Sequence, residues 1–168
     1  MTQKLRYSKP NPGFGLVETV IGAAIISIIL IGLAEVGRFT FRLVDASNFK
    51  IRASFLTEEG IEAVRGLRDA GFTAYITPIL LDTDYYLSFS SGSWNLATIP
   101  SPLVDSAFSR TVRFSAVCRD ASDAIANCGT PPVTDLNTKK VTVAVGWVDR
   151  GKAGTTTIET YITNFHAN

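Results

Sequence analysis

Two cysteines in this chain have a type and spacing that could do chemistry. Cys118 and Cys128 enclose the segment CRDASDAIANC, so the two thiols could pair as a disulfide or remain as two buried thiols. A zinc site is not expected, because the chain has no CxxC pair and its one histidine, His166, is near the C-terminus.

Three oxygen-bearing side chains lie between the cysteines. Asp120, Asp123 and Asn127 offer carboxylate and amide oxygens, the ligands that Ca²⁺ prefers. Their spacing matches no defined calcium-binding loop, so a solvated polar turn is the simpler interpretation. We therefore keep calcium as a weak candidate and expect no other metal and no cofactor.

Enzymatic and nucleic-acid functions find little support in the residue content. A single histidine and the lack of a nucleophile–base pairing predict that the chain is not an enzyme. Sixteen basic residues are matched by 15 acidic ones, which excludes binding to nucleic acid through bulk positive charge. Five basic residues of the C-terminal half alternate with polar ones, as on a solvated strand face: Arg110, Arg113, Arg119, Lys139 and Lys140.

The charge content is low, and the apolar residues are concentrated in one run. Only 18% of the 168 residues are charged, against roughly 25% in soluble domains. Residues 14–34 contain a single charge, Glu18. A helix of that length measures about 31 Å, close to the roughly 30 Å of bilayer hydrocarbon. This run predicts a membrane span rather than a buried core helix.

The flanking charges predict which end stays in the cytoplasm. Lys4, Arg6 and Lys9 precede the run without any acidic residue, so residues 1–13 are expected inside and the rest across the membrane. A cleaved secretory signal ending at Gly32-Leu33-Ala34 is the competing interpretation, but its apolar region would be only about 7–15 residues long. Disulfides persist on the far side of the membrane, which favours pairing of the two cysteines.

Apolar residues continue beyond the run at helical spacing. Residues 35–70 contain no proline and present one apolar row every three to four positions, so a single helix from about 14 to 70 is predicted. We expect this first row to pack on a head domain. The second row is either the edge of that contact or a surface for other copies. The first row is Val36, Phe39, Leu43, Ala46, Phe49, Ala53, Leu56, Gly60, Ala63 and Leu67; the second is Phe41, Val44, Ile51 and Phe55.

The period changes to two after residue 71. Strands are predicted at 85–89, 94–96, 108–118, 141–148 and 155–163, with a loop over 120–138. In 108–118 the expected inner face is Phe108, Val112, Phe114, Ala116 and Cys118, and the outer face is Thr111, Arg113 and Ser115. Short turns between strands predict an antiparallel sheet, so the expected fold is α+β: a long N-terminal helix packed on a β-rich head.

The segment Gly13-Phe14-Gly15-Leu16-Val17-Glu18 resembles the class III signal peptide of type IV prepilins and type II secretion pseudopilins. In that family a short basic leader ends in glycine, phenylalanine follows, and a glutamate lies four residues beyond it. Gly15 departs from the family's usual threonine. The likeness covers about residues 1–40 strongly, and the head resembles minor-pilin heads more loosely.

This resemblance implies how the chain is processed and assembled. A prepilin peptidase of the inner membrane would cleave between Gly13 and Phe14 and methylate the new amino group of Phe14. Glu18 would then pair with the positively charged N-terminus of a neighbouring subunit, setting the register of a filament; the alternative is that Glu18 reaches the lipid headgroups. The proline kink common in the family is missing, so any unwinding would occur at Gly22, Gly32 or Gly37.

The expected organisation is a cleaved leader (1–13), a transmembrane polymerisation helix (14–34), its amphipathic half (35–70) and a β-rich head (71–168). The expected partners are other pilin subunits, the prepilin peptidase and methyltransferase, the assembly machinery of the inner membrane, and lipid before assembly. The expected location is the cytoplasmic membrane, and then a surface pilus or periplasmic pseudopilus. A pseudopilin, or an anchored surface-binding module that does not polymerise, is the alternative function.

Overall fold

The computed structural model describes residues 13, 15–128 and 133–165. The chain divides into two compact units, residues 1–44 and 45–168, and each is described by itself. Phe14 and His166 lie outside the described residues.

Helix α1 spans Leu16–Gly71, 56 residues, which confirms the predicted helix to within two residues at each end. Its N-terminal part contains an 18-residue window with a mean hydropathy of 2.5, none of it buried. By length and composition, this helix could cross a membrane. The helix is continuous through Gly22, Gly32 and Gly37, the positions where unwinding was considered.

A glycine ends α1. Gly71 has a φ of +154°, a value that residues with a side chain rarely adopt. This is not the left-handed conformation common at helix C-termini, which has φ near +57°. A short π-helix η1, Phe72–Ile76, follows it. Phe72 and Ile76 of η1 are buried, so the turn is anchored in the core.

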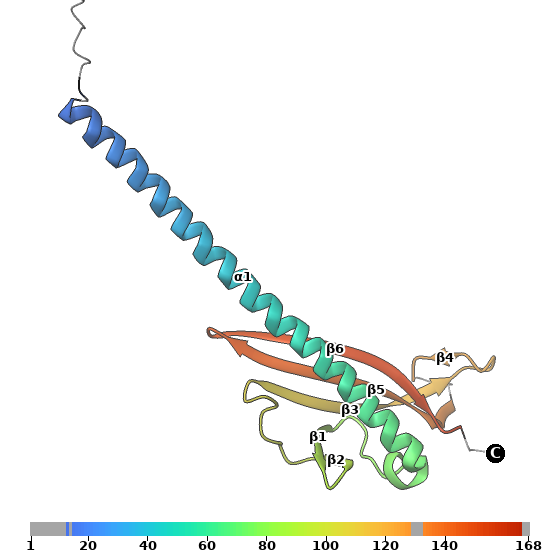
Figure 1. Cartoon of the computed structure of the whole chain (residues 1–168). Helices are drawn as coiled ribbons and strands as arrows, with labels where there is room; N and C mark the ends of the chain where they lie inside the picture. Colours follow the sequence, from blue (N-terminus) through green and yellow to red (C-terminus); the bar gives the residue numbers. More distant parts are fainter. Residues whose placement is uncertain (1–12, 14, 129–132, 166–168) are drawn as a thin grey trace, which may run out of the picture. The chain divides into compact units, whose positions relative to one another are not determined.

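The head is an antiparallel sheet in the order β2-β1-β3-β5-β6, with β4 paired to β3 (Figure 1). The strands are β1 Asp84–Ser90, β2 Ser93–Ala97, β3 Phe108–Arg119, β4 Ile125–Ala126, β5 Val133–Asp149 and β6 Lys152–Thr163. All five predicted strands are present, and the α+β fold is confirmed. The predicted loop over 120–138 is wrong in part, because β4 and the first residues of β5 lie within it.

The pairing of β3 with β5 contains a bulge within this region. The register between β3 and β5 shifts between Ala116 and Val117, after which Cys118 pairs with Thr134. Val117 and Cys118 are consecutive and both buried, whereas Ala116 is only half-buried. The inner face predicted from strict alternation is therefore wrong at Ala116, because the ladder is interrupted there: the three residues of β5 between Asp135 and Lys139 have no partner on β3.

The C-terminal half of α1 packs on this sheet. Val64 and Leu67 share a core cluster with Phe114 of β3 and Val143 of β5, while Ala53 and Leu56 share a second cluster with Phe108. The first apolar row is thus buried or half-buried from Phe49 onward. Ala46, the one earlier member in the same unit as the head, is exposed, contrary to expectation. Val36, Phe39 and Leu43 belong to the unit of residues 1–44, where they are exposed.

The second apolar row is uncovered. Ile51 and Phe55, which belong to the same unit as the head, are 53% and 65% exposed. Neither is among the described residues of the two core clusters, which favours the other interpretation, a surface for further copies.

Candidate functional site

The first candidate site is the start of α1. The carbonyl of Gly15 accepts hydrogen bonds from the backbone N–H groups of Glu18 (3.0 Å) and Thr19 (3.2 Å), which forms the first helical turn. The Thr19 hydroxyl donates to the carbonyl of Leu16 at 2.8 Å. Gly13 is exposed, and an added Cβ there would meet nothing within 4 Å. Gly13, on one side of the expected cleavage position, is therefore exposed among the described residues.

Glu18 is an exposed carboxylate in this first turn. Among the described residues it makes no side-chain hydrogen bond or ion pair. It lies near the positive end of the helix dipole. The apolar side chains around it, Leu16, Val17 and Ile21, are all exposed. This surface can attract a cation within an apolar environment, where the charge would otherwise cost about 2.5–3.5 kcal/mol.

The second candidate site is the loop between the cysteines. Cys118 and Cys128 form a disulfide, which confirms that the thiols pair. Cys118 is buried at the end of β3 and Cys128 is exposed. The bond closes a loop that contains all three candidate calcium ligands.

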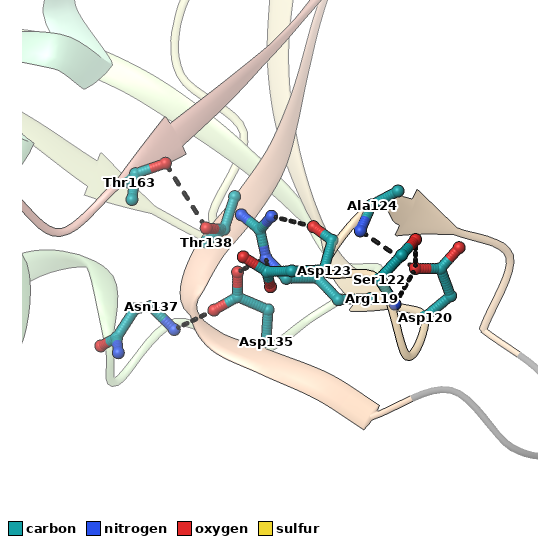
Figure 2. Close-up of polar contacts among 9 residues, drawn as sticks. All are labelled: Arg119, Asp120, Ser122, Asp123, Ala124, Asp135, Asn137, Thr138 and Thr163. Carbon is teal, nitrogen blue, oxygen red and sulfur yellow. Dashed lines mark hydrogen bonds and ion pairs between the residues drawn. The ribbon is translucent and has the colours of Figure 1, made fainter.

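Arg119 holds this loop to β5 (Figure 2). Its Nε donates to Oδ2 of Asp135 at 2.7 Å, and its Nη1 donates to the carbonyl of Asp123 at 2.8 Å. The hydrogen bond to Asp135 raises the pKa of Arg119 above its ordinary value. Partial burial of Asp135 opposes its ionisation, but hydrogen bonds from Arg119, Thr138 and the Asn137 backbone outweigh this and lower its pKa.

Asp120 accepts hydrogen bonds from within the loop itself. Its Oδ1 accepts hydrogen bonds from the Ser122 hydroxyl (2.6 Å), the Ser122 N–H (2.9 Å) and the Ala124 N–H (3.0 Å), as Figure 2 shows. These bonds, that of the Ser122 hydroxyl first, lower the pKa of Asp120. Asp123 instead turns to Arg119, with Oδ1 3.6 Å from Nε. The described residues include no group of three or more His, Cys, Asp or Glu placed to hold a metal ion. The bonding of Asp120 and Asp123 accounts for both as parts of a hydrogen-bonded turn.

The basic residues of the sheet are not a uniform solvated face, which corrects the prediction. Arg110 is only 6% exposed and Lys139 only 8%. Nη1 of Arg110 donates to Oε1 of Glu59 at 3.0 Å and to the carbonyl of Leu56 at 3.3 Å. Alternation alone could have placed Arg110 inside, since it lies two residues from the buried Phe108 and Val112.

The other basic residues of that set are paired on the surface. Arg113 lies 2.7 Å from Asp84, and Lys140 lies 2.9 Å from Glu159. The hydrogen bond between Lys140 and Glu159 raises the pKa of the lysine and lowers that of the glutamate. No free basic patch results from these residues.

Comparison with known proteins adds no assignment. No family model, curated protein or solved structure significantly matches the chain. The resemblance of residues 13–18 to prepilin signals therefore stays an expectation drawn from the sequence.

Proposed function

We propose that this chain is a structural subunit of a type IV pilus or pilus-like filament. The observation that carries the proposal is Glu18, an exposed carboxylate in the first turn of a helix whose apolar stretch is long enough to cross a membrane and is not buried. A charge at that place needs a cation, and an apolar surface of that length needs lipid or other helices.

Processing would supply the cation. The chain would be inserted as a single-pass precursor in the cytoplasmic membrane, with residues 1–13 inside, and cleaved after Gly13. Cleavage creates an amino group on Phe14, and N-methylation keeps that amine basic. Glu18 of one subunit would then pair with the amino group of Phe14 of the next. Contacts between the apolar helices would replace their contacts with lipid.

The second apolar row supports assembly through the helix. Ile51 and Phe55 are exposed on the half of α1 that also packs on the head. Large exposed apolar side chains in a row at helical spacing are typical of a contact surface. In the proposed filament they would contact the helix of a neighbouring subunit.

Two alternatives share part of this chemistry. A type II secretion pseudopilin would be processed in the same way and would form a periplasmic filament. A membrane-anchored surface-binding module would keep the helix as an anchor and would not need Glu18.

The mass of the mature N-terminus tests the proposal directly. A purified chain that begins at N-methyl-Phe14 is the expected result, and a Gly13→Leu variant should accumulate as the unprocessed precursor because a bulky side chain obstructs the cut. An intact N-terminus in the wild type, or normal shortening of Gly13→Leu, would overturn the assignment. Electron microscopy of cells with and without this subunit then separates surface pilus, periplasmic filament and monomeric anchor.

A further inference from the structure

A groove lies between the C-terminal end of α1, with η1, and the hairpin β1–β2. It has two lobes of about 270 Å³ each, which share Leu67, Tyr75, Trp94 and Asn95. One lobe extends toward Tyr85 and the other toward the hairpin turn at Gly92 and Ser93. We call it the Tyr75–Trp94 groove; it lies entirely within the unit of residues 45–168.

The two aromatic walls are held in place. Trp94 packs against Phe89 with ring centroids 5.1 Å apart and lies under the guanidinium of Arg110 at 5.3 Å. Tyr75 is half exposed, and its turn is fixed because Phe72 and Ile76 are buried. A rigid aromatic wall loses little conformational entropy when a ligand binds.

Small residues leave the groove open. Gly66, Ala70, Ala74 and Gly92 line it, and an added Cβ at Gly66 or Gly92 would meet nothing within 4 Å. Leu67 is buried and lines both lobes. A flat ring therefore has room beside Tyr75 and Trp94.

The lining contains no charged residue, and its polar side-chain groups are three hydroxyls, one amide and the indole N–H of Trp94. Asn95 donates through Nδ2 to the Ser90 hydroxyl (3.1 Å) and the Ser93 carbonyl (3.3 Å), which leaves its Oδ1 as an acceptor. The Tyr85 hydroxyl accepts from the Leu80 N–H at 2.9 Å and keeps its own proton to donate. A suitable ligand is therefore neutral and carries both C–H surface and hydroxyl groups.

We infer that the Tyr75–Trp94 groove binds a neutral sugar ring of a glycan. Ring C–H bonds, with their partial positive charge, would lie against the negative π-face of Tyr75 or Trp94. The sugar hydroxyls would hydrogen-bond to Asn95 Oδ1 and to the Ser93 and Tyr85 hydroxyls. Apolar and aromatic side chains combined with a few polar groups are the usual lining of a small-ligand pocket. The inference does not depend on filament assembly.

Isothermal titration calorimetry of the full chain tests this inference. The chain is held in lipid nanodiscs, because glycoside detergents would compete for the groove. The probes are neutral trisaccharides of glucose, galactose and N-acetylglucosamine, with a sialylated trisaccharide and a proline-rich decapeptide for comparison. Tyr75→Ala is compared with Tyr161→Ala, because these two tyrosines are exposed to similar extents, 50% and 48%. Unfolding midpoints confirm that each variant is folded.

We expect at least one neutral trisaccharide to bind saturably, with affinity about tenfold weaker for Tyr75→Ala and unchanged for Tyr161→Ala; tenfold corresponds to about 1.4 kcal/mol. Asn95→Ala should weaken binding severalfold. In a Trp147→Phe background, Trp94 is the only tryptophan. Its fluorescence emission should shift as the trisaccharide is added and should saturate over the same concentrations as the binding measured by calorimetry. No binding by any neutral trisaccharide, equal binding by Tyr75→Ala, or binding of the peptide alone would overturn the inference.

Discussion

Nη1 of Arg110 lies 3.0 Å from Oε1 of Glu59 and joins strand β3 to helix α1. The Arg110 side chain is 4% exposed, and its Nε is buried without a hydrogen-bond partner among the described residues. The guanidinium therefore depends on Glu59, the Leu56 carbonyl and the face of Trp94 for its stabilisation. The carboxylate of Glu59 is half exposed and reaches inward to it.

Removing Glu59 should destabilise the head more than removing the arginine. We expect Glu59→Ala to lower the free energy of unfolding by about 1–3 kcal/mol, because it leaves a buried charge under-solvated. Arg110→Met should cost less, since it removes the charge and keeps apolar volume. Thermal unfolding of the full chain measures both. The control is Glu62→Ala, which breaks an exposed pair with Arg65 on the same helix; a loss for Glu59→Ala no larger than this one would contradict the argument.

Gly60 allows α1 to approach the sheet closely. A Cβ on Gly60 would lie 2.7 Å from Cγ1 of Val143 and 3.3 Å from Cδ of Arg110. Gly60→Ala should therefore cost about 1–3 kcal/mol through overpacking. Gly66→Ala, six residues later with open space around it, should be neutral or stabilising by up to about 1 kcal/mol. Equal unfolding midpoints for the two variants would show that the contact with Val143 relaxes freely.

Reducing the disulfide should loosen the loop. The bond between Cys118 and Cys128 closes an eleven-residue loop, for which chain entropy gives about 2.8 kcal/mol. We expect a reductant to lower the unfolding midpoint of the wild type and to leave a Cys118→Ser/Cys128→Ser variant unchanged. A midpoint that is insensitive to reductant would mean that the native loop needs no covalent closure.

Asp135 should make the stability depend on pH in the acid range. Its pKa is lower in the folded chain than its ordinary value near 3.9, so its contribution is present at higher pH and is lost as the pH falls through the folded pKa. The difference in unfolding midpoint between wild type and Asp135→Asn should be full at pH 7 and shrink below about pH 4. Asp123→Asn is the control, because its side chain is 86% exposed and should change the midpoint little. A difference for Asp135→Asn that persists at low pH would contradict the ion pair with Arg119.

Glu18→Ala should insert and be cleaved normally but enter filaments poorly. If each contact loses one charge pair, we expect incorporation to fall by roughly tenfold, equivalent to about 1.4 kcal/mol. Glu35→Ala is the matched control, since Glu35 is also exposed on α1 and, among the described residues, pairs only with Arg38 of the same helix. Immunoblots of sheared filaments measure both variants. Wild-type incorporation of Glu18→Ala would contradict pairing with Phe14.

The sequence predicted those features that depend on local spacing. The bounds of α1, the five strands and the packing of Ala53, Leu56 and Leu67 on the sheet follow from periods of 3.6 and 2. The disulfide followed from two cysteines expected beyond a membrane. Glu18 stood out because it is the only charge in an apolar run.

Other features depend on residues that are far apart in the chain. The bulge at Ala116–Val117 depends on how β5 pairs with β3, and the buried Arg110 depends on Glu59, 51 residues away. The Tyr75–Trp94 groove needs a helix end and a hairpin to lie side by side. A repeating pattern along the chain determines which side chains share a face, because backbone geometry sets the period of a helix or strand. Only the packing of those faces decides which residues meet, because that depends on register, volume and hydrogen bonds between segments that the local pattern does not specify.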